Sequence, residues 1–260
     1  MNFKNLKINY EPWTYAVVDN FLSRKEILNL KKEIINFKSF DDKVMINRNR
    51  INKGSDNFKN IIQNSVNIKK LYNRINSKKF YQKVYNFFDP LKIQWTPEAD
   101  FKKYSKNFFG EQKFSLKEKI IKKLSLLNII NSTLNLDIDF SVSKKGYYRS
   151  PHRDRDTRVL SFLLYLNTVN KEHGGSLEIH QSNKNKKLQD DYSRFPEKNQ
   201  IKKIKKIQAK AGRLIVFFSS PDSYHAAEKI KKDKIKRVFI YGSFSLNKKV
   251  VWKRLNDDYK

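Results

Sequence analysis

The stretch SPHRDRDTRVLSFLLYLN, residues 150–167, places two metal-binding side chains directly before an apolar segment. In an extended chain, residues i and i+2 project from the same face, so His152 and Asp154 can reach one metal ion. Residues 158–167 are almost continuously apolar, which is typical of a buried strand. The stretch therefore predicts a ligand pair at the start of a strand in a β-rich fold.

Four more short apolar segments surround this stretch in the second half of the chain. They are LDIDFSVS (136–143), GSLEIH (175–180), RLIVFFSS (213–220) and RVFIYGSFS (237–245). Their spacing and the turn residues between them predict an antiparallel sandwich or barrel.

The first half of the chain shows a helical pattern after one opening strand, which we expect within residues 13–22. Ser23 begins a capping-box pattern, and apolar residues then recur every three or four positions on one helical face. We expect further helices over 58–72, after Ser77 and from Ser115. Because no obvious linker separates the two patterns, we predict an α+β fold in which helices buttress a β-core.

We expect one domain, residues 1–260, with two parts. Residues 1–135 form a mainly helical support region with an opening strand, and residues 136–246 form the core. A Lys-rich insertion, residues 183–210, lies between two predicted strands. We expect a solvated surface loop there, with or without a strand at its end, and contact with an acidic partner is the alternative.

The chain has 260 residues and a formal net charge of +30, from 56 Lys and Arg against 26 Asp and Glu. Clustered basic side chains would provide affinity for nucleic acid or for an anionic membrane. The lysines are instead scattered over nearly every segment, which favours compositional drift. We therefore do not favour a nucleic-acid partner, although it stays an alternative. No apolar run approaches the ~18 residues of a membrane span.

The sequence contains no cysteine. This excludes disulfides, iron–sulfur clusters, thiolate zinc sites and a cysteine nucleophile. Any metal site must therefore use His, Asp, Glu or water. The N-terminal segment lacks the apolar run of a signal peptide, so we expect a cytoplasmic protein.

A third metal ligand follows the apolar segment 213–220. The chain has four histidines, at positions 152, 173, 180 and 225. His225 stands just after this segment and a turn-like Pro-Asp-Ser. Two histidines and one carboxylate on one face form the triad of non-haem Fe(II) oxygenases. Zinc accepts the same ligands.

Arg237 begins the next apolar segment. If His225 and Arg237 lie on neighbouring antiparallel strands, the guanidinium can sit deep in the barrel, close to the metal. Its planar, always-charged fork suits a bidentate carboxylate partner. This pairing would hold a dicarboxylate beside the metal.

The ordered series GYYRSPHRD, RVLSFLLYLN, GGSLEI, GRLIVFFSS, His225 and RVFIYGSF spans residues 146–245. It resembles the 2-oxoglutarate and Fe(II)-dependent dioxygenase superfamily, and within it the prolyl 4-hydroxylase-like branch. The segment YAVVDNFLSRKEI near the start also looks like the opening strand and helix of that branch. The order of the motifs is far more specific than any one of them.

The resemblance implies a double-stranded β-helix, or jelly roll, as the catalytic core. It implies that His152, Asp154 and His225 hold the iron and that Arg237 binds the distal carboxylate of 2-oxoglutarate. Tyr165 would donate a hydrogen bond to the same carboxylate, with simple core packing as the alternative. The implied cofactors are Fe(II), 2-oxoglutarate and O2, with ascorbate as an optional reductant.

The implied reaction couples decarboxylation of 2-oxoglutarate, to succinate and CO2, with hydroxylation of a substrate. The carboxylate at the second ligand position favours oxygenation, because similar halogenases carry a small residue there. The substrate stays open between a prolyl residue of a protein and a small molecule. Four arginines around the metal-binding segment suggest an anionic substrate; they are Arg149, Arg153, Arg155 and Arg158.

Two alternatives stay open. A zinc hydrolase would use the same three ligands, but no HExxH-type spacing is present to supply a general base. A basic nucleic-acid-binding protein would carry a vestigial or zinc-occupied His/Asp/His site, and its binding would depend strongly on salt.

Overall fold

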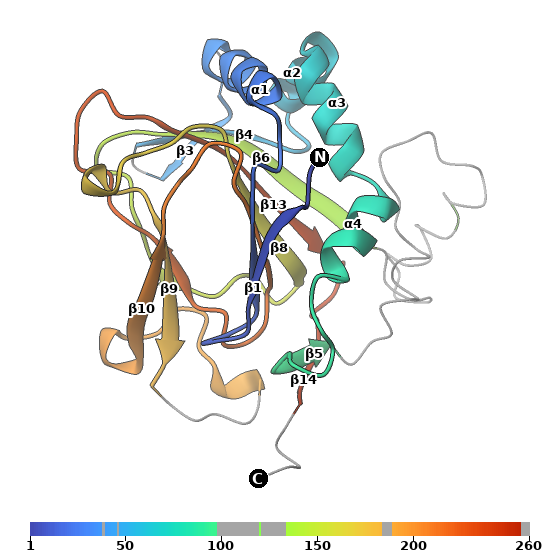
Figure 1. Cartoon of the computed structure of the whole chain (residues 1–260), viewed down its shortest axis with the longest axis vertical. Coiled ribbons are helices and arrows are strands. Elements are labelled where there is room, and N and C mark those ends of the chain that lie inside the picture. Colours follow the sequence, from blue (N-terminus) through green and yellow to red (C-terminus); the bar gives the residue numbers. More distant parts are fainter. Residues whose placement is uncertain (38–39, 46, 98–119, 121–133, 184–188, 256–260) are drawn as a thin grey trace.

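Two antiparallel β-sheets face each other, and helices lie on the outer side of the larger one (Figure 1). This computed structural model describes residues 1–37, 40–45, 47–97, 120, 134–183 and 189–255. In these ranges, no helix has both the length and the apolar character needed to cross a membrane. The arrangement confirms the predicted α+β class with a jelly-roll core.

The larger sheet has eight strands in the order β1-β2-β11-β8-β13-β6-β4-β3. Their bounds are β1 (Asn5–Asn9), β2 (Tyr15–Asp19), β3 (Asp42–Met45), β4 (Arg48–Asn52), β6 (Asn135–Ser143), β8 (Arg158–Tyr165), β11 (Leu214–Phe218) and β13 (Arg237–Ser245). Strand β13 pairs with β6 on one edge and with β8 on the other. The strands expected at β2, β6, β8, β11 and β13 are confirmed.

The smaller sheet has the order β10-β9-β12-β7. Its strands are β7 (Arg149–His152), β9 (Leu177–Ser182), β10 (Ile201–Ile207) and β12 (His225–Ala227). Strand β10 is the strand at the end of the Lys-rich insertion 183–210. It pairs with β9 and buries Ile207, while Lys203 donates to Glu178 over 3.1 Å.

The helices and the remaining short elements come mainly from the first part of the chain. They are α1 (Arg24–Asn36), α2 (Asp56–Asn64), α3 (Val66–Ile75), α4 (Lys78–Tyr85), the 3-10 turns η1 (Lys171–His173), η2 (Gln189–Asp191) and η3 (Lys198–Gln200), and the pair β5 (Trp95–Pro97) and β14 (Trp252–Arg254). Residues 1–135 also contain β1 to β5, so this region has more strand than the one opening strand we expected.

The helix starts follow the predicted capping signals. Ser23 accepts from the Glu26 amide, and the Glu26 carboxylate accepts from the Ser23 amide over 2.9 Å, which completes the capping box of α1. Ser77 caps α4 by accepting from the Phe80 amide. The single helix expected over 58–72 is wrong, because Ser65 is extended (φ −116°, ψ 101°) and separates α2 from α3. The helix expected from Ser115 lies outside the described residues.

Aromatic side chains join the helices to the outer face of the larger sheet. The Phe80 ring of α4 meets the Phe162 ring of β8 edge-on, with centroids 6.1 Å apart. Phe162 lies directly over Gly242 of β13, where a Cβ atom would come within 2.2 Å of the Phe162 ring. Glycine at this position therefore lets the layers approach closely.

A second apolar cluster fills part of the space between the two sheets. It includes Trp13, Phe217 of β11 and Leu177 of β9, all almost fully buried. The Trp13 indole donates to the backbone oxygen of His180 over 2.9 Å, which ties the N-terminal segment to the smaller sheet. Polar side chains line much of the remaining inner space, where the candidate site lies.

Candidate active site

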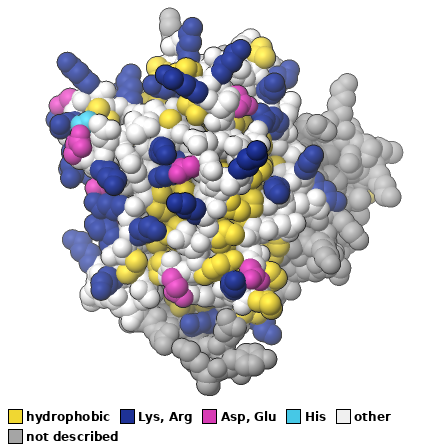
Figure 2. All heavy atoms as spheres, in the orientation of Figure 1, with side chains coloured by type: hydrophobic (Ala, Val, Ile, Leu, Met, Phe, Trp, Pro, Cys, Tyr) yellow, Lys and Arg dark blue, Asp and Glu magenta, His cyan; other side chains and the backbone are white. Residues whose placement is uncertain are grey.

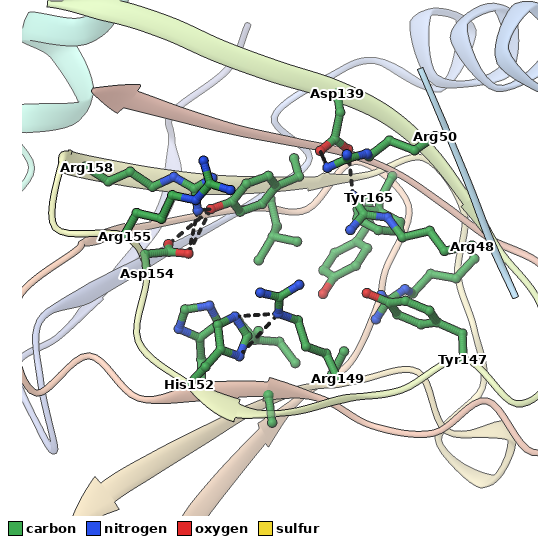
Figure 3. Close-up of a pocket in the computed structure, with 18 of the residues that line it drawn as sticks. Arg48, Arg50, Asp139, Tyr147, Arg149, His152, Asp154, Arg155, Arg158 and Tyr165 are labelled. Atoms are coloured by element: carbon green, nitrogen blue, oxygen red, sulfur yellow. Dashed lines mark hydrogen bonds and ion pairs between the residues drawn. The ribbon is translucent and has the colours of Figure 1, made fainter. Parts of the chain in front are cut away.

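A cavity of about 320 Å³ opens between the two sheets and contains the predicted metal-binding residues (Figure 3). His152 lies at the end of β7 and His225 at the start of β12, and these two residues are direct partners in the strand pairing. Three ligand atoms lie within 4.8 Å of one another, one each from His152, Asp154 and His225, and all three residues are buried. The structure therefore brings the predicted triad together.

Backbone carbonyls orient both imidazole rings. The Nδ1 atom of His152 lies 2.8 Å from the Ser150 oxygen, and that of His225 lies 2.9 Å from the Ser223 oxygen. A carbonyl can only accept, so Nδ1 carries the hydrogen and Nε2 keeps the lone pair. Burial lowers the pKa of both rings. The imidazoles are therefore neutral near pH 7 and suited to a metal ion.

Three donors hold the Asp154 carboxylate. Arg158 donates over 2.6 Å, Ser161 over 2.5 Å, and the Tyr241 hydroxyl lies 3.0 and 3.1 Å from the two oxygens. Burial alone would raise the pKa of Asp154, but the charge of Arg158 and the hydrogen bond from Ser161 hold it below its usual range. The group is therefore ionised and fixed in position.

The ion pair with Asp154 gives Arg158 a structural role, whereas the sequence only suggested that it attracts an anionic substrate. Tyr241 and Ser161 were not predicted as site residues. Both follow the period of two along strands that were predicted, β13 and β8, because Tyr241 shares a face with Arg237 and Ser161 shares one with Tyr165.

Arg237 and Tyr165 line the same cavity and carry buried polar atoms without partners in the described part of the chain. Arg237 is 2% exposed and donates through Nη1 to the Gly175 oxygen over 2.8 Å, while its Nε makes no hydrogen bond. The Tyr165 hydroxyl also makes none. An unmet buried donor costs about 1–3 kcal/mol, so a carboxylate that accepts from both groups fits this end of the cavity.

His225 and Arg237 are not on neighbouring strands of one sheet, so that expectation is wrong. Strand β12 belongs to the smaller sheet and β13 to the larger one. The reason is that β13 already pairs on both edges, with β6 and β8, and has no edge left for β12. Both side chains still line one cavity, because the sheets face each other across it.

Strand β4 supplies two cavity arginines that the sequence did not reveal. Arg48 donates to Asp139 of β6 over 2.7 Å, and Arg50 lies 3.9 Å from the same carboxylate (Figure 3). The alternation Arg-x-Arg is typical of a strand. However, the sequence of this five-residue strand does not indicate which strand it pairs with. The other two histidines, His173 and His180, do not join the triad.

Comparison with known proteins agrees with this geometry. Residues 138–244 match the family model described as 2OG-Fe(II) oxygenase superfamily. This part of the chain is a 2-oxoglutarate and Fe(II)-dependent oxygenase domain. The superfamily resemblance is thereby confirmed, and the protein is a dioxygenase whose cofactors are Fe(II), 2-oxoglutarate and O2. No curated protein matches the sequence significantly.

Solved structures similar to the oxygenase include a prolyl-4-hydroxylase from Pseudomonas putida, with 14% identity over 89% of this chain and 91% of that chain (TM-score 0.46). A viral collagen prolyl hydroxylase from Paramecium bursaria Chlorella virus-1, in complex with 2-oxoglutarate, has 15% identity over 89% and 94% (TM-score 0.42). HygX from Streptomyces hygroscopicus, with nickel and 2-oxoglutarate bound, has 10% identity over 89% and 82% (TM-score 0.46).

Proposed function

We propose that this oxygenase is a hydroxylase in which His152, Asp154 and His225 hold Fe(II). Arg237 and Tyr165 bind the distal carboxylate of 2-oxoglutarate. One observation supports the proposal above all. A single cavity contains two buried neutral histidines, an ionised carboxylate and two buried donors without hydrogen-bond partners, on Arg237 and Tyr165. Three protein ligands on one face leave positions for the cosubstrate and dioxygen.

The bound iron and cosubstrate would supply the oxidising chemistry, in which 2-oxoglutarate loses CO2 to become succinate and the substrate gains a hydroxyl group. The protein would supply position and charge. Arg158, Ser161 and Tyr241 keep Asp154 ionised, and the Ser150 and Ser223 carbonyls fix the imidazole tautomers. Apolar side chains in the cavity wall, such as Leu163, would exclude water.

Phe239 and Tyr147 support the position of Arg237. The guanidinium carbon lies 4.5 Å from the Phe239 ring centre and 5.1 Å from that of Tyr147. These rings and the Gly175 carbonyl fix the side chain before any ligand arrives. A preorganised guanidinium loses little freedom when it binds a carboxylate.

The test is reconstitution with Fe(II) without oxygen, followed by addition of 2-oxoglutarate and O2 and measurement of succinate. We expect succinate from the wild type, none from Asp154→Ala, and a raised KM for 2-oxoglutarate in Arg237→Gln. Arg24→Glu on α1, outside the cavity, is the control and should match the wild type. Tight zinc binding without any iron-dependent turnover would refute the proposal and support the zinc alternative.

The distribution of charge on the face that Figure 2 shows does not favour the nucleic-acid alternative. Figure 2 shows Lys and Arg side chains spread over one face between uncharged and acidic groups, not gathered into one patch. The prolyl 4-hydroxylase-like branch, the cytoplasmic location and the division at residue 135 stay predictions from the sequence.

A further inference from the structure

The cavity carries far more positive than negative charge. Among the described residues that line it, seven are arginines: Arg48, Arg50, Arg149, Arg155, Arg158, Arg194 and Arg237. Two are aspartates, Asp139 and Asp154. A concave site lined by one sign of charge concentrates ligands of the opposite sign.

Four of these arginines already have a function. Arg158 pairs with Asp154, and Arg48 and Arg50 share the carboxylate of Asp139. Arg237 is assigned to the cosubstrate. This leaves Arg149, Arg155 and Arg194, which we call the mouth arginines.

The mouth arginines come from two segments, the metal-binding segment and the insertion between β9 and β10. Arg149 begins β7, Arg155 directly follows the ligand Asp154, and Arg194 belongs to the insertion between β9 and β10. In the described ranges, no carboxylate lies within 4.0 Å of Arg155 or Arg194. The insertion thus contributes a basic side chain to the cavity that its Lys-rich sequence did not distinguish.

Of the mouth arginines, Arg194 shows the clearest need for a bound acceptor. Its Nε is buried and makes no hydrogen bond, and its guanidinium carbon lies 4.9 Å from the centre of the Phe195 ring. Burial lowers its pKa, and the nearby charges of Arg155 and Arg149 lower it further. These like charges repel each other, and a bound anion would relieve the repulsion and accept the missing hydrogen bond.

Arg149 connects the mouth arginines to the metal site. Its Nε donates to the Nε2 lone pair of His152 over 2.8 Å, as Figure 3 shows. The same lone pair cannot serve a metal ion and a donor hydrogen together. Metal binding at His152 would therefore release the Arg149 Nε–H toward another acceptor.

We propose that the mouth arginines bind a phosphate group of the substrate and so hold the carbon to be hydroxylated at the iron. This inference rests on the proposed function. A phosphate monoester is a dianion with three outer oxygens, and it suits three guanidinium groups in one cavity better than a single carboxylate does. The cavity, about 320 Å³, is at the lower end of ligand sites and must also hold 2-oxoglutarate, so a charged end of the substrate belongs at its mouth.

Arg153 does not belong to this group, although we expected it to share an anionic-substrate surface. Its side chain is buried, pairs with Asp156, and donates to the Tyr192 oxygen over 3.1 and 2.9 Å. Arg153 does not line the cavity, because these contacts hold its guanidinium against Asp156 and the Tyr192 backbone.

The experiment is calorimetric titration of the full-length protein, loaded with Ni(II) and saturating 2-oxoglutarate, with phenyl phosphate at constant ionic strength. Benzyl alcohol and benzoate serve as the neutral and carboxylate probes. We expect phenyl phosphate to bind and both other probes to bind at least about tenfold more weakly. Arg155→Glu and Arg194→Glu should each weaken phosphate binding by about tenfold or more.

Arg24→Glu makes the same change of charge outside the cavity and should leave phosphate binding unchanged. Arg155→Gln and Arg194→Gln repeat the test without charge reversal, and thermal unfolding confirms that each variant is folded. Equal weakening in Arg24→Glu, or benzoate binding as tight as phenyl phosphate, would overturn the inference. The inference would also be overturned if the protein bound long polynucleotides but not phenyl phosphate.

An arm with Arg237→Gln separates this site from the cosubstrate site. Phosphate binding should survive in this variant, and its loss would place the anion at Arg237 and overturn the inference. Wild-type protein that forms succinate but binds no phenyl phosphate would refute the phosphate site alone. Phosphate binding that depends on Arg155 and Arg194, without any turnover of 2-oxoglutarate, would refute the proposed function alone.

Discussion

Replacing Tyr241 with Phe removes a single hydroxyl that contacts Asp154, one of the proposed metal ligands. That hydroxyl lies 3.0 and 3.1 Å from the two carboxylate oxygens and also accepts from Arg158. The ring itself packs against Arg158, whose guanidinium carbon is 5.1 Å from the ring centre, and Phe keeps this contact. The variant therefore tests the hydrogen bond more than the packing.

The expected magnitude follows from this geometry. One hydroxyl has one hydrogen, so the variant loses one charge-assisted hydrogen bond to Asp154, worth about 1.5–3 kcal/mol. Arg158 and Ser161 still hold the carboxylate, which limits its displacement. Loss of a group that supports a metal ligand commonly weakens metal binding by about 10–100-fold, and we expect the same range here.

The assay is titration with Ni(II) followed by calorimetry, because Ni(II) does not oxidise in air as Fe(II) does. Tyr165→Phe is the matched control, because it also removes one buried hydroxyl from the cavity but has no hydrogen bond to Asp154. We expect Tyr165→Phe to keep the metal affinity of the wild type and to bind 2-oxoglutarate more weakly.

Two results would refute the reasoning. The first is an affinity of Tyr241→Phe for Ni(II) within about twofold of the wild type, which would mean that the hydroxyl does not support Asp154. The second is an equal loss in Tyr165→Phe, which would mean that any change of cavity polarity disturbs the metal site.

Three further changes test the fold. Gly242→Ala places a Cβ atom 2.2 Å from the Phe162 ring and should lower the free energy of unfolding in urea by about 1–3 kcal/mol; an unchanged value would contradict the packing. Burial raises the pKa of Asp222 to about 6, so wild-type stability should fall from about pH 4 to 6, and Asp222→Asn should remove on the order of 2–3 kcal/mol of that fall; identical pH curves would count against it. Arg153→Met removes the hydrogen bonds to the Tyr192 oxygen and should lower the melting temperature while phenyl phosphate binding stays intact; weaker phosphate binding would return Arg153 to the cavity.

The sign of the Asp222 effect follows from proton binding. Between the unfolded pKa near 4 and the folded pKa of about 6, the native carboxyl holds a proton that the unfolded one has lost. Raising the pH through this window therefore favours the unfolded chain. Ser220 donates to the Asp222 carboxyl over 2.8 Å and offsets only part of the effect of burial.

The helices show what local sequence can and cannot predict. The starts of α1 and α4 were predictable, because Ser23 and Ser77 cap the amides three residues ahead of them. The break at Ser65 was not. Helices α2 and α3 bury their apolar faces in the same cluster, so the apolar repeat continues across the break.

The site divides in the same way. His152, Asp154, His225, Arg237 and Tyr165 were predicted because each has a fixed place in an ordered series of motifs. The cavity residues Arg48 and Arg194 were not predicted. They depend on pairings between distant segments, such as β4 with β6, and on the path of the insertion after β9. Side-chain period alone does not choose a partner strand.

The triad joins the two sheets. His152 and His225 belong to the smaller sheet, while Asp154 is held by Ser161 and Tyr241 of the larger one. An ion bound by all three would act as a cross-link between the sheets, at the cavity that polar side chains line. Thermal stability should then rise with free metal concentration, since a ligand that binds only the folded state stabilises it by mass action. Removal of the metal should therefore lower the stability of the fold as well as abolish the activity of the enzyme.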